Sequence, residues 1–205
     1  MRAATTMRVD VGCDLIENGG GNLSMWMLFR SSFQNGITLA RKRRGVASTQ
    51  QFMFRLVHIE AHCTGDVVDI EGGPMGLTMI HHHHSDWVAG PGKRAFWVHP
   101  RTALFDVHGS EMRFVGDVEV AGNPFTQRVW QQNNLYENGT VSYDVDGALP
   151  NLLWNRYTNC TLVVPPTAFS PVVVRQSEFF NTQIDGQSSF APISLRECYR
   201  SGGTL

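Results

Sequence analysis

Four consecutive histidines, His81 to His84, are the most conspicuous residues in this sequence that could carry chemistry. On a β-strand alternate side chains share a face, so we expect His81 and His83 on one face and His82 and His84 on the other. Two imidazoles on one face can hold a transition metal if further ligands complete the shell. The candidates for those further ligands are Asp86, His99, His108 and His58. The same four histidines predict a pH-sensitive cluster, because imidazoles become charged and repel one another below about pH 6.5.

The cupin motif, an HxH on a strand of a small β-barrel, is one form that such a metal site takes. Gly76, His82 and His84 fit the first part of that motif. The acidic ligand expected next is missing, since Val88 and Ala89 stand there, and no second motif with a ligand histidine follows. A cupin-like β-barrel metalloprotein that uses the four-His segment is therefore the alternative prediction. The favoured interpretation of the segment is a polar strand or loop rim with no metal and no other cofactor.

Arg41, Lys42, Arg43 and Arg44 form a concentrated run of positive charge. Such a run can neutralise several phosphates and release counterions, so these four residues are the candidate RNA contacts. The strand-like segments on both sides favour a solvated loop for the run itself. Because the whole chain has 17 basic and 18 acidic side chains, any contact with nucleic acid must be local.

No motif of a known catalytic centre is present. The sequence contains no G-x-S-x-G elbow, no Walker loop, no H-E-x-x-H and no S-x-x-K. Cys63 follows His62 directly, which places the two side chains on opposite faces of a strand. The four cysteines are far apart and predict free thiols. The prediction is a protein that is not an enzyme and, without an apolar run of eighteen residues, not a membrane partner.

Short segments with strand periodicity must position these residues. The segment from Gln51 to His62 alternates and then shifts phase near Val57, which predicts a long strand with a bulge. Leu23 to Phe33 is compatible with a strand or a short helix. Other predicted strands are 76–84, 95–99, 102–107, 111–120, 140–145, 151–154, 161–164 and 172–180. We recognise no internal repeat and no helix long enough for a βαβ unit, so the pattern favours an antiparallel sandwich or barrel.

The order of strands and breakers from Phe52 to Phe180 resembles the jelly-roll coat proteins of picorna-like plant viruses, of the secovirus and waikavirus type. In that pattern a long strand, here Phe52 to Ala61, is followed by a Gly-led apolar strand, here Gly76 to Ile80. The closing strand and its acidic-aromatic turn match Val172 to Phe180. The segments that correspond in between are Phe96–Pro100, Ala103–Val107, Met112–Val120, Gly122–Phe125 and Cys160–Pro166.

The resemblance implies an all-β fold, an antiparallel eight-stranded two-sheet jelly-roll sandwich. It divides the chain into an N-terminal arm over 1–21, a capsid domain over 22–200 and a tail over 201–205. It implies a structural coat protein, a polyprotein product that assembles with other capsid protein chains into a non-enveloped icosahedral shell around positive-strand RNA. The expected locations are the virion and, during assembly, the host cytoplasm. A basic N-terminal arm, common in such coat proteins, is missing here.

Composition adds two further expectations. Only 17% of the residues are charged, against about a quarter in an average soluble domain, which favours a subunit whose edges are covered by neighbours. The tryptophans favour a third hypothesis, a carbohydrate-binding or other recognition sandwich, although aromatic side chains are more often part of the core. They are Trp26, Trp87, Trp97, Trp130 and Trp154.

Overall fold

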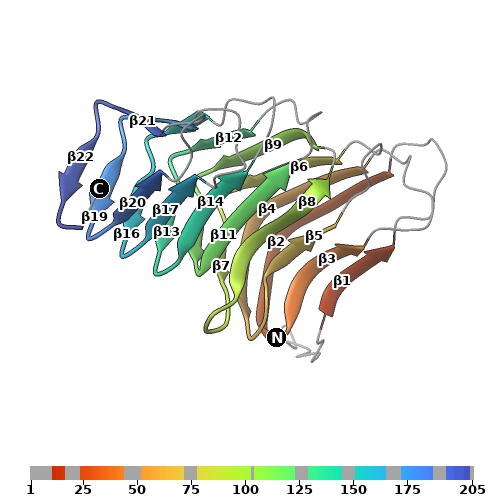
Figure 1. Ribbon diagram of the computed structural model, residues 1–205. Coiled ribbons are helices and arrows are strands. Elements are labelled where there is room, and N and C mark those ends of the chain that lie inside the picture. The colour runs from red at the N-terminus through yellow and green to blue at the C-terminus, as the bar shows by residue number, and fades with distance from the viewer. Residues whose placement is uncertain are drawn as a thin grey trace.

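The protein is a parallel β-solenoid, in which the chain winds through successive turns that stack along one axis (Figure 1). A computed structural model describes residues 11–16, 24–43, 52–71, 78–102, 104–122, 129–144, 151–164, 172–186 and 193–203. Every strand pair in this part of the chain is parallel. The all-β prediction is confirmed, but the antiparallel jelly-roll sandwich is wrong.

One face of the solenoid, here called the third face, is an eight-stranded sheet. Figure 1 shows its strands side by side, all pointing the same way. In spatial order they are β1 (Val11–Ile16), β3 (Thr38–Arg43), β5 (Val68–Ile70), β8 (Arg94–Thr102), β11 (Asp117–Gly122), β14 (Thr140–Asp144), β17 (Thr161–Val164) and β20 (Gln183–Gly186).

The remaining strands form a fourteen-stranded sheet that includes two faces. The first face contains β6 (Thr78–His83), β9 (Leu104–Ser110), β12 (Val129–Gln132), β15 (Asn151–Leu153), β18 (Val172–Arg175) and β21 (Ile193–Arg196). The second face contains β7 (Asp86–Val88), β10 (Arg113–Val115), β13 (Leu135–Glu137), β16 (Arg156–Thr158), β19 (Glu178–Phe180) and β22 (Tyr199–Ser201). Two long strands, β2 (Ser24–Gly36) and β4 (Phe52–Cys63), pair with each other along their length. Strand β4 joins the two faces, because its first half pairs with β6 and its second half with β7.

Equivalent residues of successive turns stack in the interior, where strands of neighbouring turns are about 4.8 Å apart. The clearest column is aromatic and fully buried, and it consists of Trp87, Phe114, Tyr136, Tyr157 and Phe179. The rings of Tyr136 and Tyr157, and those of Tyr157 and Phe179, are 4.9 Å apart and within 7° of parallel. These stacked pairs lie within the range of centroid distances at which aromatic contacts stabilise a core.

Two corners of the solenoid use residues with a left-handed backbone, the first from β4 onward and the second from β10 onward. The first corner column, between the first and second faces, has φ values between 47° and 57° at the residues from β4 onward. Its members there are His58, His84, Glu111, Asn133, Trp154, Gln176 and Glu197. The second corner column, between the second and third faces, consists of Gly116, Asn138, Asn159, Asn181 and Gly202. Backbone hydrogen bonds link each corner to the next turn, for example from Trp154 N to Arg175 O at 3.1 Å.

The strand segments expected from the sequence are present, but their connections differ from the prediction. The phase shift near Val57 is a corner at His58 and not a bulge. Residues 111–120 and 172–180 are each divided between two faces, as β10 with β11 and β18 with β19. Contrary to the sequence analysis, the chain is repetitive, since residues on neighbouring turns that hydrogen bond are mostly 21 to 27 positions apart. Strand β1 lies within residues 1–21, the range predicted as an arm.

Candidate functional site

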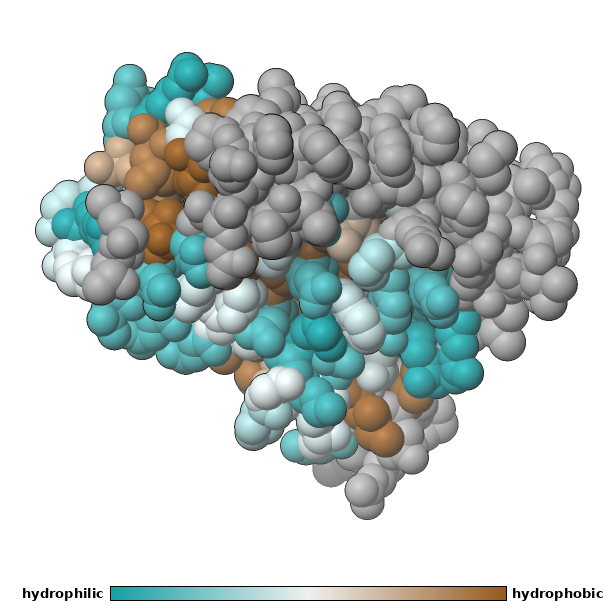
Figure 2. All heavy atoms as spheres, in the orientation of Figure 1, coloured by the Kyte–Doolittle hydropathy of each residue, from teal (hydrophilic) through white to brown (hydrophobic). Residues whose placement is uncertain are grey.

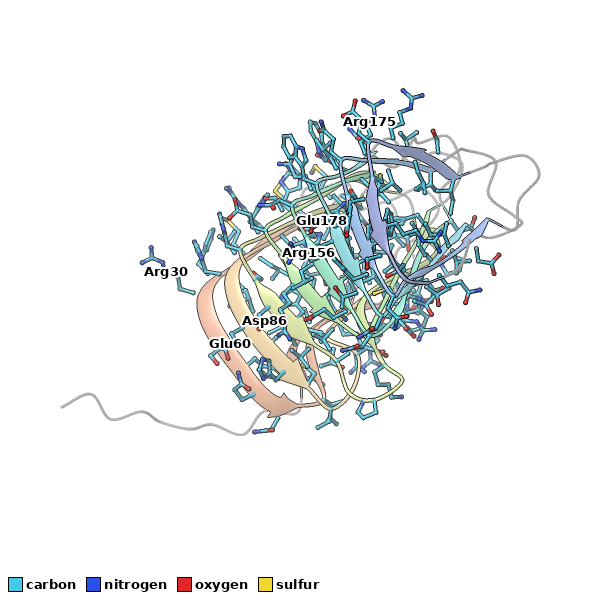
Figure 3. The ribbon with its side chains drawn as sticks, turned by 90° about the vertical axis from the view of Figure 1, so that its left-hand side faces the viewer. Arg30, Glu60, Asp86, Arg156, Arg175 and Glu178 are labelled. Atoms are coloured by element: carbon cyan, nitrogen blue, oxygen red, sulfur yellow. The ribbon has the colours of Figure 1, made fainter. Side chains whose placement is uncertain are left out.

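A groove with a volume of about 930 Å³ follows the first corner column across successive turns. It is lined by the corner residues and by the adjoining part of the second face, with residues His58, Ile59, Glu60, His84, Ser85, Asp86, Glu111, Met112, Arg113, Asn133, Asn134, Leu135, Trp154, Asn155, Arg156, Gln176 and Glu178. We call this surface the corner groove. In Figure 3, Glu60, Asp86, Arg156 and Glu178 follow one another along the same side of the ribbon in the order of their turns. The groove is therefore built by repetition, and its length follows the solenoid axis.

The floor of the corner groove is held by hydrogen bonds between turns. The side-chain oxygen of Asn134 accepts a bond from Met112 N at 3.0 Å, and that of Asn155 accepts one from Asn134 N at 2.9 Å. Ser177 Oγ continues the series by accepting from Asn155 N at 3.0 Å. All three side chains are buried, so each satisfies a backbone N–H that the corner leaves without a strand partner. The groove residues next to them therefore project from a rigid base.

Arginines and carboxylates alternate along the second-face side of the groove. The Arg113 guanidinium lies 3.1 Å from Asp86 Oδ1 on one neighbouring turn and 2.6 Å from Glu137 Oε2 on the other. Arg156 donates to Glu178 Oε2 at 2.7 Å. These pairs fix the orientation of the charged groups, while their partial exposure leaves hydrogen-bonding capacity toward solvent.

Trp154 is the large aromatic side chain of the groove, and 55% of its surface is exposed. Its indole Nε1 donates to Gln176 Oε1 at 2.9 Å, which anchors the ring to the next turn. Gln176 in turn donates to Glu197 Oε2 at 2.9 Å. An exposed ring that is held by a hydrogen bond offers a flat apolar surface at a low cost in conformational entropy.

Two histidines, His58 and His84, line the end of the groove nearest β4, and His62 lies close to two of its carboxylates. The rings of His58 and His84 are stacked, with centroids 5.0 Å apart, and His84 also contacts the Glu111 carboxylate. His62 Nε2 lies 3.9 Å from oxygens of both Glu60 and Asp86. Imidazole and carboxylate groups are thus adjacent in this part of the groove, where they can donate and accept hydrogen bonds.

The structure distributes the four-His segment over three environments. His81 and His83 lie half-buried on the outer side of the first face, where His81 Nε2 is 3.2 Å from Asp106 Oδ2. His82 is fully buried against the rings of Trp87 and Phe96, and burial lowers its pKa well below 6.5. His84 belongs to the corner groove. The prediction that the four histidines form a pH-sensitive cluster stays a prediction. Of the four, His82 is the fully buried residue.

A metal centre is not assembled by the described residues, which contain no group of three or more His, Cys, Asp or Glu side chains placed to hold an ion. The antiparallel β-barrel that the cupin-like alternative requires is wrong, because the strands of this solenoid are parallel. The predicted basic run begins on strand β3 and not in a loop. Lys42 points into the interior and donates to Glu71 O at 3.2 Å, Arg41 is half-buried and Arg43 is exposed, while Arg44 lies outside the described residues. RNA contact by these residues stays a prediction.

The sequence analysis missed the corner groove, although a signal for it exists. A short pattern recurs in which a corner residue is followed one position later by a buried Met, Asn or Ser, three positions later by a buried aromatic residue and five positions later by Asn or Gly. The pattern reads EMRFVGD from Glu111, NNLYENG from Asn133, WNRYTNC from Trp154 and QSEFFNT from Gln176. Aligning these segments would have placed Glu111, Asn133, Trp154 and Gln176 in one column.

Comparisons with known proteins add no relative. No family model matches the chain, and neither do any curated protein or any solved structure. The prediction of a coat protein that assembles with sister chains therefore stays a prediction, and the jelly-roll fold on which it was based is wrong. In the described part of the chain, no helix has the length and apolar character that a membrane crossing requires.

Proposed function

We propose that this protein binds an extended polysaccharide chain along the corner groove. The observation that carries the proposal is the exposed, hydrogen-bonded ring of Trp154 among the polar side chains of a long groove. A sugar ring has an apolar face that packs on an aromatic ring and hydroxyls at its edge that need hydrogen-bond partners. Trp154 offers the first kind of contact, and the ion pairs of Arg113 and Arg156 offer the second.

The shape of the groove favours a polymer over a small molecule. Its lining residues repeat with every turn, about 4.8 Å apart, so similar contacts recur along the axis. A chain of linked sugars also repeats along its length and can use several such positions at once. Solenoid proteins commonly use extended surfaces of this kind for binding.

The charges of the groove argue against a nucleic acid as its occupant. Glu60, Asp86, Glu111 and Glu178 accompany Arg113 and Arg156, so the groove has no basic excess, which backbone phosphates require. A peptide added as an extra strand is also disfavoured, because the strands on both sides of the groove already pair with their neighbours. The outer side of the third face, largely hydrophilic in Figure 2, has no aromatic groove of this length among the described residues.

Binding to a panel of neutral and uronic-acid polysaccharides, followed by tryptophan fluorescence and affinity electrophoresis, tests the proposal. We expect at least one polymer to bind and Trp154→Ala to weaken that binding at least tenfold, because stacking anchors of this type dominate binding energy. Tyr199→Ala is the matched control, since Tyr199 is similarly exposed but does not line the groove. No binding to any polymer, or equal binding by Trp154→Ala and the wild type, would overturn the proposal.

A further inference from the structure

A serine and a histidine form a close pair on the outer side of the first face. Strands β6 and β9 pair in a register that places His83 beside Ser110. His83 Nδ1 lies 2.6 Å from Ser110 Oγ, and both side chains are half-buried. This distance lies within the range found between a nucleophilic hydroxyl and the base that activates it.

The protonation state of His83 suits a base. Burial, followed by the neighbouring His108, His81, Arg55 and His84, lowers the pKa of His83 to about 4. At neutral pH the ring is therefore uncharged, and Nδ1 can accept the hydrogen bond that the Ser110 hydroxyl donates. Asp106, the nearby carboxylate on the same face, lies 3.2 Å from His81 Nε2.

Neighbouring side chains fix the His83 ring and provide positive charge. The His108 ring packs edge-on against His83 with centroids 5.1 Å apart, and His108 itself stacks on Trp130 at 5.7 Å. Arg55, an exposed side chain on the preceding turn, acts electrostatically on His83 and supplies positive charge of the kind that stabilises a developing oxyanion.

The pair lies at the rim of the corner groove. His83 and Ser110 directly precede His84 and Glu111, two residues that line the groove. A substituent that projects from a chain bound in the groove toward the first face points in the direction of this pair. The position of the pair next to the groove relates it to the proposed ligand. The geometry of the pair itself does not depend on that ligand.

We propose that Ser110 and His83 act as nucleophile and base in the hydrolysis of ester substituents, such as O-acyl groups, carried by the bound polysaccharide. The substrate class rests on the proposed function. Ser110 Oγ bonds to the carbonyl carbon while its proton moves to His83 Nδ1. The bond to the sugar oxygen then breaks, and that oxygen takes the proton from His83. Water attacks the acyl-serine with His83 again accepting a proton, which releases the carboxylic acid and restores Ser110.

Labelling with a fluorophosphonate probe, followed by peptide mass spectrometry, tests the pair without any polysaccharide. We expect a single label on Ser110, no label on Ser110→Ala, and at least a tenfold slower reaction of His83→Gln. Ser142→Ala, which removes a half-buried outward serine of the third face, should be labelled as the wild type is. The labelling rate should stay constant as the pH falls to about 5 and decline near pH 4, the pKa of His83.

Two further measurements separate this proposal from the proposed function. Trp154→Ala should lose polysaccharide binding but keep the label on Ser110, and Ser110→Ala should keep binding but release no acid from an O-acetylated polymer. Circular dichroism and thermal unfolding of each variant confirm the fold. An unlabelled but folded wild type, a label on another residue, or His83→Gln reacting at the wild-type rate would overturn the proposal.

Discussion

The two corners of the solenoid make the same backbone turn with different kinds of residue. The second corner column uses Gly and Asn, the residues that adopt a left-handed backbone most readily. Its asparagines also form a ladder, with Asn159 donating to Asn138 at 3.2 Å and Asn181 to Asn159 at 3.0 Å. The first corner column places histidine, glutamate, tryptophan and glutamine in that conformation, although each of them is strained there.

This difference between the two corners indicates that the residues of the first corner lower the stability of the fold. From Gly116 onward, Gly or Asn adopts the left-handed conformation at the second corner. The first corner has the same conformation but carries side chains that are less suited to it, and these side chains line the corner groove. Backbone strain recurs in successive turns at the first corner. This indicates that the side chains there have a role other than forming the turn.

Gly139→Ala should have the largest effect, and it tests how strictly the second corner depends on small residues. A Cβ at position 139 would lie 2.2 Å from the carbonyl oxygen of Gly116, so two turns must separate. We expect a loss of about 3 kcal/mol in the free energy of unfolding, measured with urea. Gly92→Ala is the control, because position 92 has open space and a φ of +66°, and it should lose only about 1 kcal/mol. Equal losses of unfolding free energy in the two variants would show that backbone strain, and not close contact between turns, is the reason for small residues at this corner.

Acid should weaken the protein through His83, which directly precedes the first-corner residue His84. The pKa of His83 is lowered from 6.5 to about 4, so the unfolded chain binds a proton at a higher pH than the folded one. Stability is then complete above about pH 6.5 and falls as the pH decreases to about 4. After allowance for the partial exposure of the ring, we expect a contribution of about 1 to 2 kcal/mol. Urea unfolding between pH 7.5 and pH 4 should show a shallower decline in His83→Gln, and an identical decline would contradict the assignment.

Glu111→Asn should raise stability, which would show directly that the first corner is strained. Asn accepts the φ of 56° better than Glu, so we expect a gain of about 0.5 to 1 kcal/mol in thermal unfolding. Glu178→Asn is the matched control, because Glu178 also takes part in an exposed ion pair but lies on strand β19. If Glu178→Asn raised thermal stability by as much, relief of left-handed strain would not explain the gain in Glu111→Asn.

Arg113→Gln should have the smallest effect on stability. Although Arg113 contacts Asp86 and Glu137, the pairs are partly exposed, and we expect the two together to contribute less than about 0.5 kcal/mol. We expect the difference from the wild type to shrink in 1 M salt, where exposed charges are screened. A loss of several kcal/mol that persists in salt would mean that the groove charges hold the first corner together, against the comparison drawn above.

The sequence predicted the strands well because strand formation is local. Alternating residues such as those of Phe52–Cys63 indicate which side chains share a face, whatever the partner strand is. They do not indicate whether that partner runs parallel or antiparallel. Here the partner strand lies one turn away. Only the repetition of the corner pattern in the sequence indicates that successive turns pair in parallel. The sequence shows the shift in alternation at Val57, but a corner and a bulge shift the alternation in the same way.

The candidate site was less accessible to sequence analysis because its members are distant in the chain. The tryptophans raised the carbohydrate hypothesis, yet nothing distinguished the exposed Trp154 from the buried Trp87 before the turns were aligned. His83 was singled out within its run, whereas its partner Ser110 is 27 residues away and belongs to no motif. The run at Arg41 to Arg44 was interpreted as a loop, but alternation on β3 directs Lys42 into the core.

The stacked column of Tyr136, Tyr157 and Phe179 has a consequence for how ligand length is set. Because these rings meet at nearly the same distance and angle, one turn of this region is structurally interchangeable with the next. Insertion or removal of a whole turn would preserve the stacking and the strand register, yet it would lengthen or shorten the groove by one step. If the proposed polysaccharide binds along the corner groove, the number of turns sets how many of its sugar units the groove can contact.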